Sequence, residues 1–64
     1  MTQKELLYLE DAVMHENNII SICNNCLDFI EDDNLISFFN GEIIIHNKIK
    51  DNLLNLLEVT ANEW

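Results

Sequence analysis

Residues 6–30 decide the fold, and their sequence is LLYLEDAVMHENNIISICNNCLDFI. Apolar side chains recur there in alternating steps of three and four, the spacing of one face of an α-helix. The row consists of Leu6, Leu9, Val13, Ile20, Cys23, Leu27 and Ile30, with Glu16 as its one acidic interruption. Ala12, Ile19 and Cys26 widen the row to a stripe of about 100°, typical of a helix that packs against more than one neighbour. The stretch therefore predicts a long amphipathic helix.

The second half of the chain repeats this spacing. Its row consists of Leu35, Phe39, Glu42, His46, Ile49, Leu53 and Leu56, with Phe38, Ile45 and Val59 on its flanks. Further apolar residues lie off the row, at Ile36, Ile43, Ile44, Leu54 and Leu57. We therefore expect a second helix that is apolar around more than half of its circumference.

The few helix-stop signals set the boundaries. Thr2 and Glu5 have the spacing of a capping box, which starts a helix near residue 3. The polar run at residues 31–34 contains aspartates that can cap a following helix, and the chain has no proline and only one glycine. We expect a single domain over residues 1–64 with helices at about 3–31 and 33–61. The predicted fold class is all-α, an antiparallel two-helix hairpin.

A hairpin of this composition cannot cover its own apolar surface. A chain of 64 residues buries only about 60% of the surface that it exposes when unfolded. Large exposed apolar patches on soluble proteins mark interfaces, and the simplest closed assembly is a two-fold dimer. We expect two hairpins to form a homodimeric four-helix bundle.

Charge limits the partners. The net charge is −9, from twelve Asp and Glu against three Lys and Arg together. Nucleic acid and anionic membranes are therefore excluded as expected partners, because both require clustered basic residues. No run approaches the roughly 18 apolar residues of a membrane helix, and no secretory signal is visible, so the expected location is the cytoplasm. The expected partner is a second copy of the chain, or a helix of another protein that packs on the apolar face.

Three polar residues interrupt the predicted apolar rows: Glu16, Glu42 and His46. In a hairpin that turns near residue 32, residue numbers that sum to about 64 share one level, so Glu16 lies within about 3 Å of helix rise from His46. Glu42 precedes His46 by one helical turn. The residues permit a hydrogen-bonded Glu16–His46 pair that fixes helix register, a metal site of all three residues, or an error in helix phase that leaves them exposed.

The stretch Leu6-Leu7-Tyr8-Leu9-Glu10-Asp11-Ala12, followed by His15-Glu16 and by His46 in the second half, resembles the small ferritin-like proteins that are grouped with bacterial spore-coat proteins. The resemblance covers nearly the whole chain. It implies a ferritin-like helical fold and association with spores. A two-fold axis near the level of Glu16 and His46 would gather up to four carboxylates and two imidazoles from Glu16, Glu42 and His46, an inventory that matches the di-iron or di-manganese carboxylate site of ferritin-like bundles. The chain departs from the family motif Glu-x-x-His, because three residues separate Glu42 from His46 and position 43 is Ile.

Cys23 and Cys26 have the spacing of a redox motif, but they fall in the middle of the predicted helix rather than at its N-terminus, where a thiol is activated. We expect packing thiols; a disulfide across a dimer axis and a soft metal ligand are the alternatives. No nucleophile motif or phosphate-binding loop is present, so we expect no enzyme. The expected function is a structural or interaction protein, with a metal-binding ferritin-like protein as the alternative.

Overall fold

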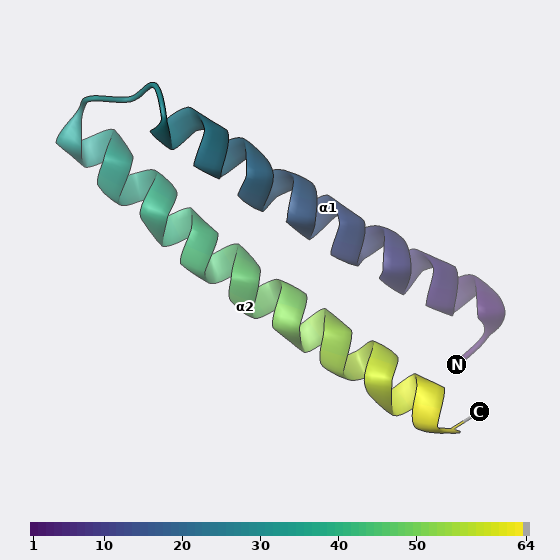
Figure 1. Cartoon of the computed structure of the whole chain (residues 1–64). Helices are drawn as coiled ribbons and strands as arrows, with labels where there is room; N and C mark the ends of the chain where they lie inside the picture. Colours follow the sequence, from purple (N-terminus) through teal and green to yellow (C-terminus); the bar gives the residue numbers. More distant parts are fainter. Residues whose placement is uncertain (64) are drawn as a thin grey trace.

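The structure is a computed structural model that describes residues 1–63, with side chains for residues 1–59. Helix α1 (Gln3–Leu27) and helix α2 (Asp33–Glu63) run antiparallel and lie side by side, so that the start of α1 and the end of α2 are at the same end of the molecule (Figure 1). No strand occurs within the described part. These observations confirm the all-α fold class and the two-helix hairpin.

The N-terminus of α1 is closed by the predicted capping box. The Glu5 backbone N–H donates to Thr2 Oγ1 at 3.1 Å, and the Thr2 backbone N–H donates to Glu5 Oε1 at 2.8 Å. Two amides that helix geometry leaves without a carbonyl partner are satisfied in this way. Residue 3 is therefore the first helical residue, as the sequence indicates.

The end of α1 differs from the expected boundary near residue 31, because α1 stops at Leu27. The N–H groups of Asp28 and Phe29 donate to carbonyls three residues earlier, at 3.2 and 3.0 Å, which tightens the last turn. Asp28 brings negative charge to the negative end of the helix dipole, where the last turn has no basic residue. Asp32 then caps α2 by accepting the Leu35 N–H at 3.0 Å. The turn thus occupies residues 28–32 instead of being confined to residues 31–34.

The core of the hairpin is a single seam between the two helices. The α1 side of this seam is the one that the sequence predicts, from Leu6 through Glu16 and Cys23 to Leu27. The α2 side is rotated relative to the predicted row. Its half-buried inner line consists of Ile36, Phe39, Ile43, His46, Lys50, Leu53 and Leu57. Leu35, Ile49 and Leu56, which the sequence placed in the seam, are 48%, 38% and 52% exposed, so their predicted positions in the seam of the hairpin are wrong.

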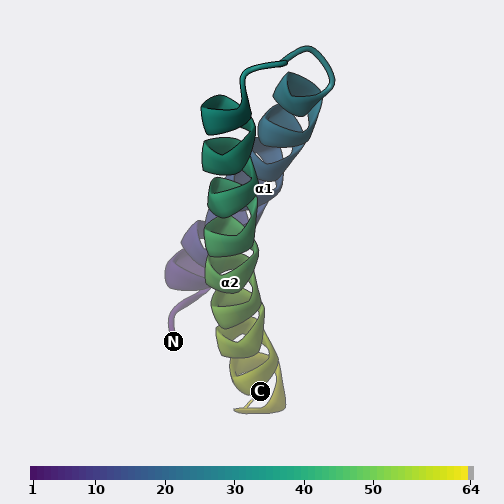
Figure 2. The same ribbon diagram turned by 90° about the vertical axis from the view of Figure 1, so that its left-hand side faces the viewer.

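The two helices cross instead of lying strictly parallel, as the orthogonal view shows (Figure 2). Because it consists of one pair of long helices, the molecule is long and thin, with extents of 48 × 15 × 12 Å. Neither helix, over its described residues, combines the length and the hydropathy that a membrane crossing requires.

Candidate functional site

His46 and Glu16 connect the two helices at the level of the predicted polar interruption. His46 Nδ1 lies 2.6 Å from Glu16 Oε2, and both side chains are largely buried, at 20% and 15% exposed. This contact confirms the predicted Glu16–His46 hydrogen-bonded pair. It also fixes the register, since a slip of one turn would separate the two groups by about 5 Å.

Glu42 joins the pair from within α2. Its Oε2 lies 3.3 Å from His46 Nε2, across one helical turn, and its side chain is 33% exposed. Glu42 is therefore at the edge of the seam, whereas Glu16 lies within it. The structure brings together all three polar residues that the sequence singled out, with His46 as the common centre.

The ring of His46 has a carboxylate at each nitrogen. A neutral imidazole donates from only one nitrogen, while the imidazolium form donates from both. The imidazolium form would combine the hydrogen bond to Glu16 with an ion pair to Glu42. With His46 in that form, the cluster has one positive and two negative groups, which limits the cost of placing charges in an apolar seam.

A metal ion would need lone pairs that converge on one point. In this hairpin His46 Nδ1 is hydrogen-bonded to Glu16 and His46 Nε2 lies 3.3 Å from Glu42 Oε2, and among the described residues no group of three or more His, Cys, Asp and Glu side chains is arranged to hold a metal ion. The residues of a single hairpin thus form a hydrogen-bonded cluster and do not fit a metal site as they stand. The predicted site at Glu16, Glu42 and His46 stays a prediction that concerns an assembly or a rearranged cluster.

The two cysteines are free thiols. Cys23 lies in the seam and is 5% exposed, and it is the only buried side chain among those that the structure describes. Cys26 is half-buried, one turn further along α1. Both positions agree with packing thiols. Lys50 is a polar residue of the inner line that the sequence pattern did not place there. Its aliphatic stem can cover apolar surface while the ammonium reaches water.

The second candidate site is the exposed apolar surface. The solvent-accessible area of 4938 Å² exceeds the roughly 4,200 Å² that is typical of a folded monomer of 7.5 kDa. The radius of gyration of 14.8 Å likewise exceeds the roughly 11 Å of a compact domain of this length. Large side chains on both helices are exposed, among them Tyr8, Met14, Ile22, Phe38, Ile44 and Ile45. Such a surface is typical of a protein that binds another chain.

Comparison with known proteins adds no relative: no family model, no curated protein and no solved structure matches this chain.

Proposed function

We propose that this chain is a small structural or interaction protein that works as a homodimer, two hairpins forming a four-helix bundle of the ferritin-like type. The observation that carries the proposal is the small size of the core: Cys23 alone is buried among the described side chains, while many large apolar residues are exposed. A second hairpin would supply the missing half of the core. The resemblance to small spore-coat-related proteins adds a cytoplasmic, spore-associated setting to the proposal.

The test of assembly is the molar mass in solution. Sedimentation equilibrium from about 1 to 100 μM should give twice the chain mass of 7.5 kDa. The thermal midpoint of the helical circular dichroism signal should rise with protein concentration, because folding and association are linked. A cooperatively folded species with the mass of one chain throughout this range would refute the proposal.

The competing function is metal binding by Glu16, Glu42 and His46. The observation that favours it is the convergence of two carboxylates on one imidazole, which a two-fold axis would double within one bundle. The test is a thermal melt near pH 7 with and without excess Fe(II), Mn(II) or Zn(II). A ligand at a hundredfold excess over Kd stabilises a protein by about 2.7 kcal/mol. We expect only a small shift, and the same shift in the double variant E16L/H46I. A large shift that the double variant lacks would establish metal binding in place of the structural function.

A further inference from the structure

Each helix carries a second line of residues beside its half of the seam. On α1 this line precedes the seam residues by one position and runs through Tyr8, Ala12, His15, Ile19, Ile22 and Cys26. On α2 it precedes the inner line in the same way and runs through Leu35, Phe38, Glu42, Ile45, Ile49, Asn52 and Leu56. Both lines keep the alternating steps of three and four, so each is a continuous stripe along its helix.

The two second lines share one broad face of the hairpin. Reversing the direction of a helix also reverses the sense in which its residues run around the axis. In an antiparallel pair, the flanks that precede the seam by one residue therefore lie on the same side. We call this side the apolar face, since its polar residues are few: Glu5, His15, Glu42 and Asn52.

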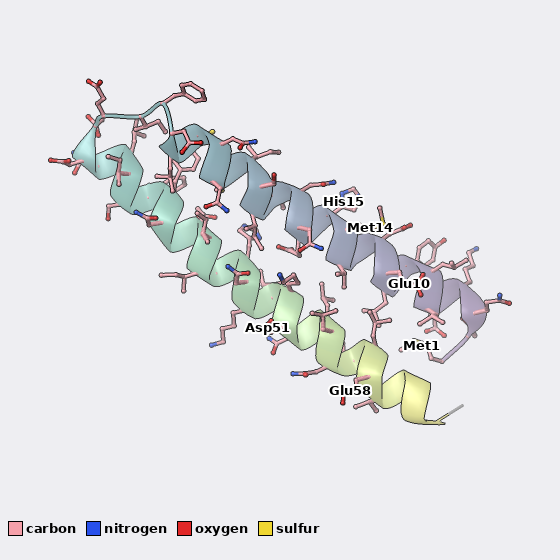
Figure 3. The ribbon with its side chains drawn as sticks, viewed as in Figure 1. Met1, Glu10, Met14, His15, Asp51 and Glu58 are labelled. Atoms are coloured by element: carbon pink, nitrogen blue, oxygen red, sulfur yellow. The ribbon has the colours of Figure 1, made fainter. Side chains whose placement is uncertain are left out.

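The opposite broad face has a different composition. It carries Glu10, Asn17 and Asn24 of α1 and Asn40, Asn47, Asp51 and Glu58 of α2; Figure 3 labels three of its carboxylates, Glu10, Asp51 and Glu58. Its apolar members are Leu7, Met14, Ile44 and Leu54. We call this side the polar face. The exposed apolar residues are therefore concentrated on one side of the hairpin, and they include Ile22 at 60% and Phe38 at 58% exposed.

The charges near the apolar face already have partners. Glu5, at the end of the α1 line, is held by Thr2, and Glu42 is held by His46. Lys4 places its ammonium 5.9 Å from the centre of the Tyr8 ring at the same end. The net charge of −9 is thus carried mainly outside this face. A basic partner would find few free carboxylates here, so the occupant that fits is itself apolar.

The size of the face fits a second hairpin. The outline of 48 × 15 Å corresponds to about 700 Å² per protomer, close to the roughly 800 Å² per partner of a standard stable interface. A second copy has the same length and presents the same apolar face, as a two-fold interface requires. Contact across it would also cover Glu42, the exposed member of the cluster around His46.

We propose that the homodimer forms through the apolar face, with Phe38, Ile45 and Ile49 of α2 and Tyr8, Ile19 and Ile22 of α1 among its contacts. This inference rests on the proposed homodimer and specifies which face it uses. The polar face stays in water. The cluster of Glu16, His46 and Glu42 then extends from the seam within each hairpin to the seam between hairpins, so that it lies inside the four-helix bundle.

Two neighbouring isoleucines provide a matched test. Ile45 lies on the apolar face at 52% exposed, and Ile44 lies on the polar face at 70% exposed. Ile45→Glu places a charge in the proposed interface and should weaken dimerisation by about 100-fold or more. Ile44→Glu adds the same charge at the adjacent position and should leave the dimer Kd within about threefold. Sedimentation of the two variants and of the native chain measures all three constants.

Each result has a defined meaning. If Ile44→Glu weakens the dimer as much as or more than Ile45→Glu, or if neither does, the proposed face is wrong while the homodimer stands. If the native chain is a monomer, the proposed function itself fails. Circular dichroism tells whether Ile45→Glu still folds.

A measurement of thiol reactivity tests which face the dimer uses without placing a charge in the interface. In the variant Cys23→Ala, Cys26 is the only thiol and reports on the apolar face. In Cys23→Ala/Cys26→Ala/Ser21→Cys, the only thiol is on the polar face. Relative to the same variant diluted below its dimer Kd, so that the partial burial of Cys26 within one hairpin cancels, modification by a disulfide reagent should slow about 10-fold or more at Cys26 and less than about twofold at Ser21→Cys. Equal protection of the two thiols would overturn the proposal.

Discussion

At the scale of single residues, the pairing of His46 with two carboxylates makes the effects of substitution unequal. Glu16→Leu removes one partner but leaves His46 in contact with Glu42. His46→Ile leaves both carboxylates without their imidazole partner, and Glu16 is the more deeply buried of the two. We expect His46→Ile to destabilise by about 1–3 kcal/mol and Glu16→Leu by less, because an unpaired group in a seam loses its solvation.

The double variant E16L/H46I should be neutral or more stable than the native chain. Both desolvation costs disappear together, and the seam gains apolar contacts. Urea unfolding of all four proteins at one protein concentration measures these differences. Additive losses in the double variant would show that the two residues act independently and that the pair does not stabilise the hairpin through their mutual contact.

Glu5 gives a prediction about pH. Its pKa lies below the ordinary value of 4.5, first because its carboxylate accepts the Thr2 backbone N–H and second because of the Thr2 side chain. The folded state thus prefers the charged form. The capping box contributes stability in full above the unfolded pKa, and that contribution is lost as the pH falls through the lowered folded pKa.

A carbon-detected NMR titration of the Glu5 carboxyl group measures this pKa. We expect a midpoint below 4.5 in the native chain. Thr2→Ala should raise the midpoint, whereas Thr2→Ser keeps the hydroxyl acceptor for the N-cap and should preserve it. A midpoint that does not respond to Thr2→Ala would contradict the role assigned to the capping box.

At the scale of the helices, Gly41 is the one glycine within α2, and glycine lowers the stability of a helix interior. It has no positive φ, and a Cβ built there would meet nothing within 4 Å. Gly41→Ala should therefore stabilise the protein by about 0.5–1 kcal/mol, because alanine loses less backbone entropy in a helix. Lys48→Ala, on the same line of α2 two turns later, is the control and should change stability by only a few tenths of a kcal/mol. A loss of stability in Gly41→Ala would mean that another chain approaches this backbone closely.

The helices also show what the sequence can and cannot predict. The α1 side of the seam was predictable because polar residues, Asp11, Asn18 and Asn25, mark the side opposite to a single stripe. On α2, two apolar stripes lie next to each other. One is the inner line, which begins at Ile36, and the other is the line on the apolar face, which begins at Leu35. A spacing pattern averages such stripes, which is why the predicted row mixed members of both. The end of α1 at Leu27 was missed because Ile30 continues the apolar spacing and no glycine or proline marks the stop.

The sequence predicted which residues form the polar cluster, but it did not predict how their atoms pair. Glu16, Glu42 and His46 are conspicuous because they replace apolar residues at helical spacing, and antiparallel pairing brings them to one level. Spacing carries no information on which oxygen approaches which nitrogen. The occupation of both His46 nitrogens by carboxylates therefore emerged only from the side-chain geometry.

At the scale of the whole molecule, charge opposes the assembly that the apolar surface favours. Each protomer has a net charge of −9, so the proposed dimer brings two strongly negative bodies together. The carboxylates nearest the apolar face are already held within their own chain, by Thr2 and His46, and leave no obvious ion pair to form between protomers. Repulsion between the outer carboxylates should therefore dominate the electrostatics of association.

This balance predicts that salt strengthens the dimer. Raising sodium chloride from about 20 to 300 mM shortens the Debye length from roughly 20 Å to below 10 Å, which screens repulsion between exposed carboxylates and leaves apolar contact intact. We expect the dimer Kd to fall by several-fold and the thermal midpoint to rise over this range. Sedimentation equilibrium at both salt concentrations measures the effect, and an equal osmolality of sucrose controls for water activity. Weaker association in salt would show instead that ion pairs between protomers hold the interface, and a face richer in charge than the apolar face would then have to form the contact.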